Sequence, residues 1–239
     1  MPSVEIIPAV MPTSFADLEA KTLRVAGVVQ SVQIDVMDGR FVTSVDWPYT
    51  GKSAQKDFDE LVQGHKVLPF AGKLAYEVDL MVSEPERVVA DWVAAGIGRV
   101  IVHVESSEYI AAARISVRVA AEKCGRRVEF GLALNTTTDN AALDPYFNHI
   151  DFVQFMGIER IGYQGQPFDE RVLGKIRDLR GKYPNVIISV DGGVNFDTAP
   201  RLIEAGANRL VSGSVIFESD DVLASIEKLR IVTKPCTRS

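Results

Sequence analysis

Short apolar runs alternate with longer stretches of mixed polarity along the whole chain. The short runs are rich in β-branched residues, which is typical of buried strands. They predict strands over residues 6–10, 32–35, 75–81, 99–103, 128–134, 152–156, 186–190 and 209–212. The stretches between them predict amphipathic helices over residues 14–25, 57–64, 86–95, 109–124, 139–146, 169–182, 198–205 and 221–230.

This order of elements predicts an α/β fold with a parallel sheet. A repeated strand–helix unit requires parallel pairing, because each helix crosses back over the sheet. Eight strands close a barrel, whereas an open sheet would leave unpaired edges. We therefore expect a (β/α)8 TIM barrel with an active site on its C-terminal face. Nothing in the sequence looks like a linker, so residues 1–239 are expected to form a single domain with a polar tail over 233–239.

Composition and charge narrow the class of partner. The chain has 239 residues, 46% of them hydrophobic, and a formal net charge of −6. Without a basic cluster it is not expected to bind nucleic acid, whose phosphates need Lys and Arg. The N-terminus lacks the pattern of a signal peptide, and no apolar run is long enough to span a membrane. Cys124 and Cys236 are too few for a disulfide framework, so we expect free thiols in a cytoplasmic protein.

Three aspartates, Asp35, Asp79 and Asp191, lie at the ends of apolar strands. An unpaired carboxylate is costly to bury, so each of these positions needs an explanation. A single acid of this kind is more often a cap or a turn residue. In a TIM barrel, however, the C-terminal strand ends carry the chemistry. We therefore expect Asp35 and Asp191 to face each other across a substrate.

Glycine-rich loops follow the sixth, seventh and eighth predicted strands. Glycine lets backbone amides approach an anion closely, and the last loops of this fold often form a phosphate site. One glycine pair is weak evidence, because turns use glycine widely, but three sets at one face predict a phosphorylated ligand. The candidate residues are Gly162, Tyr163, Gln164, Gly165, Gly192, Gly193, Gly213 and Ser214. Met37, Met81 and Met156 also fall near strand ends, either as core filler or as an apolar lining of the site.

These motifs, in this order, resemble the signature of the ribulose-phosphate 3-epimerase family. The segments that carry the resemblance are Pro8-Ala9, Asp35-Val36-Met37-Asp38-Gly39, Leu80-Met81-Val82, residues 162–168, Val190-Asp191-Gly192-Gly193-Val194 and Gly213-Ser214-Val215-Ile216-Phe217. The resemblance implies a TIM barrel that acts on a ketose phosphate. It also implies that Asp35 and Asp191 serve as base and acid on opposite faces of carbon 3, through an enediolate. The three methionines would surround that intermediate, and the glycine loops would bind the phosphate.

The sequence departs from the family at the metal site. The family holds a divalent ion with two histidines and the two aspartates, but Gln33 and Asp79 stand where the histidines are expected. Gln33, Asp35, Asp79 and Asp191 would form an all-oxygen ligand set, which favours Mg²⁺, Mn²⁺ or Ca²⁺ over Zn²⁺. Alternatively no metal binds, and crowding raises the pKa of at least one carboxyl. Arg160 could then supply positive charge, although a surface arginine is the simpler interpretation.

Together these observations predict an isomerase of pentose phosphate metabolism that epimerises a ketose phosphate at carbon 3. Activity on ribulose 5-phosphate itself stays open, as do a lyase or aldolase that shares the enediolate and a non-catalytic sugar-phosphate binder. A phosphorylated sugar is the expected partner, and a homo-oligomer is the expected assembly. The long segment 40–53, with Phe41, Trp47 and Tyr49, is expected to form a lid, or else an ordered rim or a subunit contact.

Overall fold

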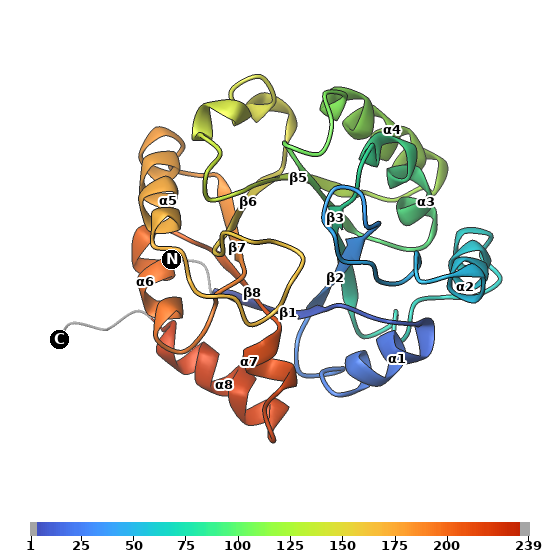
Figure 1. The fold of residues 1–239 in the computed structure, drawn as a ribbon, viewed down its shortest axis with the longest axis horizontal. Coiled ribbons are helices and arrows are strands. Elements are labelled where there is room, and N and C mark those ends of the chain that lie inside the picture. The colour runs from blue at the N-terminus through green and yellow to red at the C-terminus, as the bar shows by residue number, and fades with distance from the viewer. Residues whose placement is uncertain (1–3, 235–239) are drawn as a thin grey trace.

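The computed structural model describes residues 4–234, which contain a closed barrel of eight parallel strands. Neighbouring strands pair in chain order, and β8 pairs with β1 to close the ring. Figure 1 looks along the barrel, with the strands at the centre and the helices around them. The predicted TIM barrel is therefore confirmed. The strands are β1 Glu5–Val10, β2 Ser31–Met37, β3 Ala75–Met81, β4 Arg99–His103, β5 Glu129–Leu134, β6 Phe152–Met156, β7 Ile187–Asp191 and β8 Arg209–Ser212.

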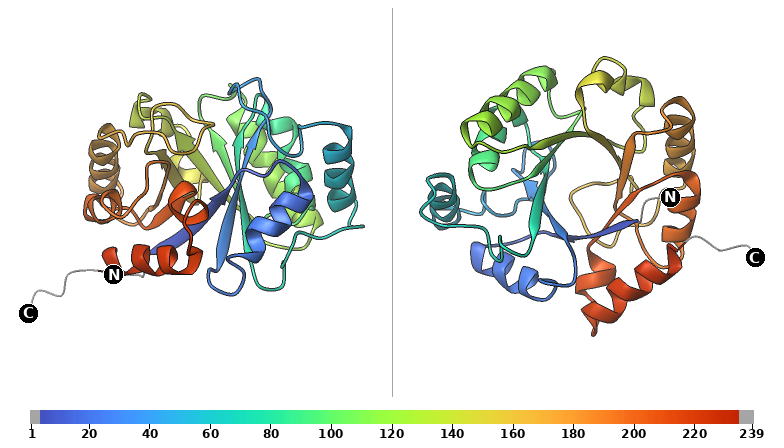
Figure 2. Two further views of the ribbon diagram at one scale, coloured as in Figure 1. Left: turned by 60° about the horizontal axis from the view of Figure 1, so that its bottom comes forward. Right: turned by 180° about the vertical axis from the view of Figure 1, so that it is seen from behind.

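Helices cover the outside of the barrel, as two further views show (Figure 2). The α-helices are α1 Phe15–Leu23, α2 Lys52–Val62, α3 Val89–Ala94, α4 Ile110–Lys123, α5 Arg171–Lys182, α6 Thr198–Ala205, α7 Ser214–Phe217 and α8 Val222–Val232. Short 3₁₀ helices are η1 Pro85–Arg87, η2 Asn140–Leu143 and η3 Phe147–His149. Cys124 is an exposed free thiol. Cys236 and residues 235–239 of the expected polar tail lie outside the described residues, while Thr233 is buried at the end of α8.

Most predicted helices match the structure to within two residues at each end, and three differ by more. α2 begins at Lys52 rather than at residue 57, because its buried face of Ala54, Phe58 and Leu61 continues the helical spacing one turn further back. The predicted helix over 86–95 divides into η1 and α3. The predicted helix over 139–146 is wrong: only the short η2 forms there and η3 follows it, since Pro145 lacks the N–H that would continue an α-helix.

The two faces of the strands differ in polarity, and this difference positions the site. In β2, Val32, Ile34 and Val36 belong to the large hydrophobic core that includes the helices. The residues between them, Gln33 and Asp35, must then point to the barrel axis, because successive side chains of a strand face opposite sides. Packing of the helices therefore forces polar side chains into the barrel interior.

Buried ion pairs close the N-terminal end of the barrel. Arg99 lies 2.8 Å from Glu77 and 3.0 Å from Glu5, and Arg209 lies 3.2 Å from Glu5. Two small apolar clusters fill the next layer, formed by Ile7, Ala9 and Val211 and by Ile101, Ala133 and Phe152. The N-terminal part of the barrel interior is thus filled with side chains, and a ligand has to approach from the C-terminal face.

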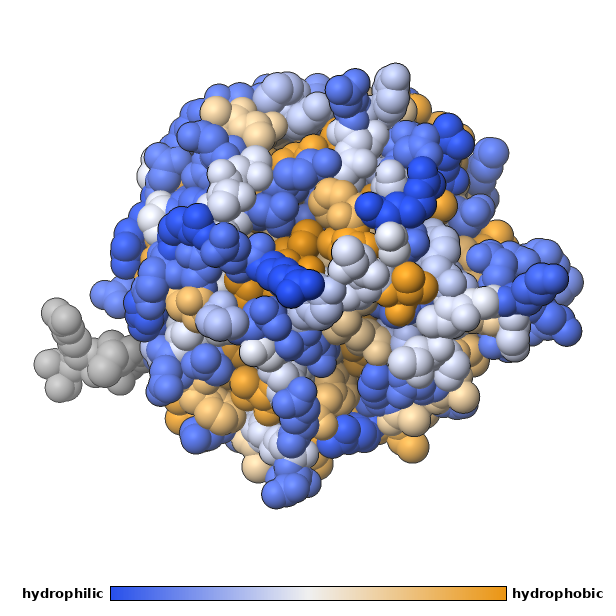
Figure 3. Space-filling model, viewed as in Figure 1, coloured by the Kyte–Doolittle hydropathy of each residue, from blue (hydrophilic) through white to orange (hydrophobic). Residues whose placement is uncertain are grey.

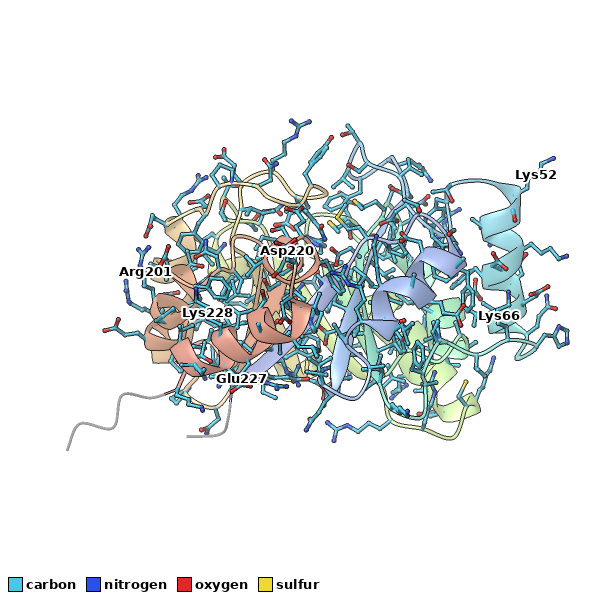
Figure 4. All side chains as sticks on the ribbon, turned by 90° about the horizontal axis from the view of Figure 1, so that it is seen from below. Lys52, Lys66, Arg201, Asp220, Glu227 and Lys228 are labelled. Carbon is cyan, nitrogen blue, oxygen red and sulfur yellow. The ribbon has the colours of Figure 1, made fainter. Side chains whose placement is uncertain are left out.

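Charged side chains cover the outer surface of the helices. Figure 4 labels Lys52 at the start of α2, Lys66 just beyond its other end, and Glu227 and Lys228 on α8. Lys66 forms an ion pair of 2.7 Å with Asp57 of α2. Between residues 4 and 234, no helix has the length and hydropathy that crossing a lipid bilayer requires.

Candidate active site

Three aspartates come together inside the barrel near its C-terminal end. Asp35 on β2 and Asp79 on β3 are register partners, and Asp191 is the last residue of β7. One carboxylate oxygen from each lies within 4.8 Å of the others, and all three residues are buried. Three adjacent buried charges repel one another strongly, so hydrogen bonds or protons have to stabilise the cluster.

The amide of Gln33 lies between two of these acids. Its Nε2 donates to Asp35 Oδ1 at 2.8 Å and to Asp191 Oδ2 at 2.8 Å. Gln33 is completely buried, and its Oε1 has no hydrogen-bond partner. The sequence predicted Gln33 as an oxygen ligand, whereas the structure turns its nitrogen toward the acids.

A second network holds Asp79. His103 Nε2 lies 3.1 Å from Asp79 Oδ1, and Gln154 Nε2 donates to Asp79 Oδ2 at 3.0 Å. The Ser189 hydroxyl donates to Gln154 Oε1 at 3.1 Å and so orients that amide. Sequence reasoning did not assign His103, Gln154 or Ser189 to the site. Their signal is positional, because each alternates with apolar residues on its strand and so points inward, as Asp35 does.

Burial and mutual repulsion shift the pKa values of this cluster. Burial, followed by the charges of Asp191 and Asp79, raises the pKa of Asp35 well above its usual value. Burial and the charge of Asp79 raise the pKa of Asp191 to about 7, while the hydrogen bond from Gln33 opposes them. Burial alone would lower the pKa of His103, but the Asp79 carboxylate helps to raise it to about 10. His103 is therefore protonated at neutral pH and balances the charge of Asp79.

By distance alone, the three buried carboxylates could hold a metal ion. An ion that links Asp35 and Asp191 would, however, meet the NH₂ group of Gln33, which is a donor and not a ligand. Both oxygens of Asp79 are also engaged by nitrogen donors. As arranged, these side chains fit a hydrogen-bonded carboxylate cluster and do not fit an ion that bridges the two acids.

A cavity of about 220 Å³ opens beside Asp35 and Asp191. The eight residues predicted as a phosphate site all line it: Gly162, Tyr163, Gln164, Gly165, Gly192, Gly193, Gly213 and Ser214. Gly193 needs to be glycine, since its φ is +67° and a Cβ there would lie 3.0 Å from the carbonyl oxygen of Gly157. The Gln164 amide packs on Gly213, where a Cβ would lie 2.5 Å from its Nε2. Backbone amides and one side-chain amide thus surround the same space.

The predicted methionines take two different positions. Met81 and Met156 line the cavity. Met37 instead contacts the loop between β6 and α5, with its sulfur 3.3 Å from the position that a Cβ at Gly162 would take. Figure 3 shows apolar side chains gathered near the middle of this face, among hydrophilic ones. The lining near the acids is therefore apolar, but only two of the three methionines contribute to it.

Two long loops meet on the C-terminal face of the barrel. They are the loop between β2 and α2 and the loop between β6 and α5 (Figure 1), and the second of them lines the cavity. Thr43 Oγ1 and Tyr163 OH lie 2.6 Å apart, and Ser44 Oγ donates to the Gly162 carbonyl at 2.8 Å. These contacts join the expected lid segment to the glycine loop, so the two loops form a clasp beside the site.

Three other residues of these loops, Phe41, Trp47 and Arg160, do not line the cavity. Trp47, expected in the lid, is fully buried in the main hydrophobic core and anchors its segment. The Phe41 ring packs against the ring of His103, with centroids 5.5 Å apart. Arg160 is exposed, stacks over the ring of Tyr163 at 4.3 Å and donates to its hydroxyl at 3.1 Å. Arg160 is thus engaged with Tyr163 of its own loop, and it does not contribute to the pKa shifts of Asp35 and Asp191.

Comparison with known proteins identifies relatives over nearly the whole chain. The profile of the Ribulose-phosphate 3 epimerase family matches residues 5–217. The chain belongs to this family. Ribulose-phosphate 3-epimerase of Bacillus subtilis (strain 168) is 30% identical over 236 residues, covering 95% of this chain and 98% of that protein. Ribulose-5-phosphate-3-epimerase, chloroplastic, of Arabidopsis thaliana is 32% identical, covering 96% of this chain and 77% of that protein.

Solved structures share the fold at much lower identity. A crystal structure of KGPDC from Streptococcus mutans superimposes with a TM-score of 0.71, at 12% identity and 97% coverage of both chains. A crystal structure of 3-keto-L-gulonate-6-phosphate decarboxylase from Vibrio cholerae superimposes with a TM-score of 0.67, at 13% identity, covering 98% of this chain and 100% of that one. A likeness at this identity shows the barrel and not the reaction.

Proposed function

We propose that this member of the ribulose-phosphate 3-epimerase family is an isomerase that epimerises a ketose phosphate at carbon 3. The observation that carries the proposal is the pair Asp35 and Asp191, which come from non-neighbouring strands and line one cavity with three glycine loops. Epimerisation needs a proton acceptor on one face of the carbon and a donor on the other. Membership of the family supports this class of reaction.

The raised pKa values of the two acids suit such an exchange. A proton-transfer group works best when its pKa is near the working pH. With the pKa of Asp191 near 7 and that of Asp35 above its usual range, one carboxyl and one carboxylate are available around neutral pH. The carboxylate removes the proton from carbon 3, an enediolate forms, and the other acid returns a proton to the opposite face. In the reverse direction the two acids exchange roles.

In this proposal the glycine loops bind the phosphate. Their backbone amides can approach an anion without a Cβ in the way, and Gln164 adds a side-chain donor. Met81 and Met156 supply an apolar wall beside the enediolate. The volume of about 220 Å³ is below the range of roughly 300–1,000 Å³ for drug-sized ligands, which suits a small sugar phosphate.

Several expectations from the sequence stay predictions. A divalent ion that entered the aspartate cluster would be Mg²⁺ or Mn²⁺ rather than Zn²⁺, because its ligands would be oxygen atoms. A homo-oligomeric assembly, a single domain over residues 1–239, a cytoplasmic location and a lack of nucleic-acid binding also stay predictions.

Solvent exchange tests the proposed reaction. Candidate ketose phosphates, beginning with ribulose 5-phosphate, are incubated with the protein in heavy water and followed by NMR. We expect deuterium at carbon 3 together with the appearance of the epimer, and neither change without protein. If folded protein catalyses no deuterium uptake across the whole set, the proposal is refuted.

A lyase is the second candidate. The structural neighbour from Vibrio cholerae is named as a decarboxylase, and cleavage of a carbon–carbon bond can pass through a similar enediolate. Such an enzyme would release smaller fragments, which mass spectrometry of the products distinguishes from an epimer. Binding without turnover, with an affinity that Asp35→Asn leaves unchanged, would instead indicate a non-catalytic sugar-phosphate binder.

A further inference from the structure

One side chain stands between the two acids of the proposed reaction. Gln33 Nε2 donates a hydrogen bond of 2.8 Å to Asp35 Oδ1 and another of 2.8 Å to Asp191 Oδ2. A metal ion shared by these acids would also have to lie between their carboxylates. The amide nitrogen therefore fills the space that a bridging cation requires.

The orientation of this amide follows from its neighbours. With Nε2 toward the acids, Gln33 makes two hydrogen bonds to carboxyl groups and leaves only its Oε1 without a partner. Turned around, Oε1 would face the acceptor oxygen of whichever acid is ionised, and that bond would become a repulsive contact. Two hydrogen bonds, one of them to a charged carboxylate, outweigh one unpartnered carbonyl. Gln33 therefore presents a donor to both acids, as a cation would present its positive charge.

The third acid has nitrogen donors as well. His103 Nε2 lies 3.1 Å from Asp79 Oδ1, and Gln154 Nε2 donates to Asp79 Oδ2 at 3.0 Å. All three residues are completely buried. An ion that took either oxygen of Asp79 would leave a buried donor without its acceptor, which is unfavourable.

We propose that the amide of Gln33 replaces the metal ion of the family, holding Asp35 and Asp191 together so that the protein binds no divalent cation at this cluster. This inference rests on the proposed function for the roles of the two acids. It concerns ion binding, however, which is measured without substrate. In this arrangement Gln33 is a positioning residue for both acids.

Titration calorimetry with Mn²⁺, and elemental analysis of protein purified with a chelator and then exposed to Mn²⁺ or Zn²⁺, test the proposal. The matched variant is Gln33→Glu, which keeps the shape of the side chain and exchanges the NH₂ donor for an oxygen ligand. We expect no stoichiometric binding to the wild type and one Mn²⁺ per chain in Gln33→Glu, with a rise in melting temperature when Mn²⁺ is added. The double variant Gln33→His/Asp79→His, which restores the imidazole ligands of the family, is expected to take up one Zn²⁺.

Two binding results would overturn the proposal. One ion bound per wild-type chain would overturn the proposal, whatever the variants do. Absence of binding to the wild type and to both variants would also contradict it, because something other than the amide would then exclude the ion. A failure of the proposed epimerase reaction would leave these results unchanged, since no substrate is present. If the wild type does turn over a ketose phosphate, we further expect its rate to be unaffected by chelator.

Discussion

Removal of the His103 side chain tests the buried charge balance around Asp79. In the folded protein His103 and Asp79 are both completely buried and lie 3.1 Å apart, and the pKa of His103 is raised to about 10. Leucine fills a similar volume to histidine but carries no charge. In His103→Leu the Asp79 carboxylate would therefore remain buried without its charged partner. The least unfavourable response is for Asp79 to take up a proton.

The magnitude follows from the protons that the folded and unfolded states bind. An unfolded aspartate titrates near pH ~3.9 and an unfolded histidine near ~6.5, and one pH unit corresponds to about 1.36 kcal/mol. Between these two pH values only the variant loses stability, because its folded state holds a proton that the unfolded aspartate has released. The loss in unfolding free energy therefore grows from near zero at pH ~4 to about 3.5 kcal/mol at pH ~6.5.

Above the unfolded pKa of histidine the difference levels off. The raised pKa of His103 contributes stability that is complete below pH ~6.5 and declines as the pH rises toward about 10. In this range the unfolding free energies of wild type and variant fall by the same amount per pH unit, so the difference between them stays near ~3.5 kcal/mol. For a chain of this length that corresponds to a fall in melting temperature of about 7–14 °C.

Urea denaturation at pH 4.5, 6.5 and 8.5 measures this profile. Ile101→Val is the matched control, because Ile101 is buried on the same strand and its truncation costs about 0.5–1.5 kcal/mol at every pH. A destabilisation of His103→Leu that is equal at pH 4.5 and pH 6.5 would refute the charged pair and leave only a packing effect.

Two further predictions concern the loops around the cavity. Gly193→Ala places a Cβ 3.0 Å from the Gly157 carbonyl at a φ of +67°, so we expect the KM for a phosphorylated substrate to rise roughly tenfold or more. The control is Gly174→Ala in α5, where an added Cβ would have no neighbour within 4 Å; it should leave the KM unchanged and add up to about 1 kcal/mol of stability. Equal KM values in the wild type and in both glycine variants would argue against this phosphate site. Tyr163→Phe removes the hydroxyl that lies 2.6 Å from Thr43 Oγ1, and should raise the KM roughly two- to tenfold and speed hydrogen exchange in both loops. Unchanged exchange in the loops would show that this contact does not hold the clasp.

The barrel could be predicted from the sequence because its strands alternate so clearly. Val32, Ile34 and Val36 are all apolar and have to face the helices, which leaves Asp35 facing the axis. The start of α2 was predicted five residues too late because the aromatic and turn-forming residues before it hide the helical spacing. The helix over 139–146 is wrong for a different reason, since Pro145 interrupts the helix that the surrounding pattern predicts.

The site was predictable in its acids but not in its hydrogen bonds. Asp35 and Asp191 follow from strand ends and from the family resemblance, because both signals are local in the sequence. The bond from Gln33 to Asp191 joins positions 158 residues apart and exists only once the barrel has closed. The family resemblance therefore suggested an oxygen ligand at Gln33, whereas the direction of its amide depends on its neighbours in space. His103 is the intermediate case, since its inward position on β4 could have been read from the alternation.

The roles of the two acids are tested most directly by following hydrogen exchange at carbon 3 of each epimer separately, in Asp35→Asn and in Asp191→Asn. Each acid serves one face of the carbon, so each variant should lose epimerisation by roughly 10²–10⁴-fold. Each variant should nevertheless still exchange deuterium into one epimer, and the two variants should act on opposite epimers. If one variant exchanged both epimers, or if both variants still interconverted them, the assignment of one acid to each face would be wrong.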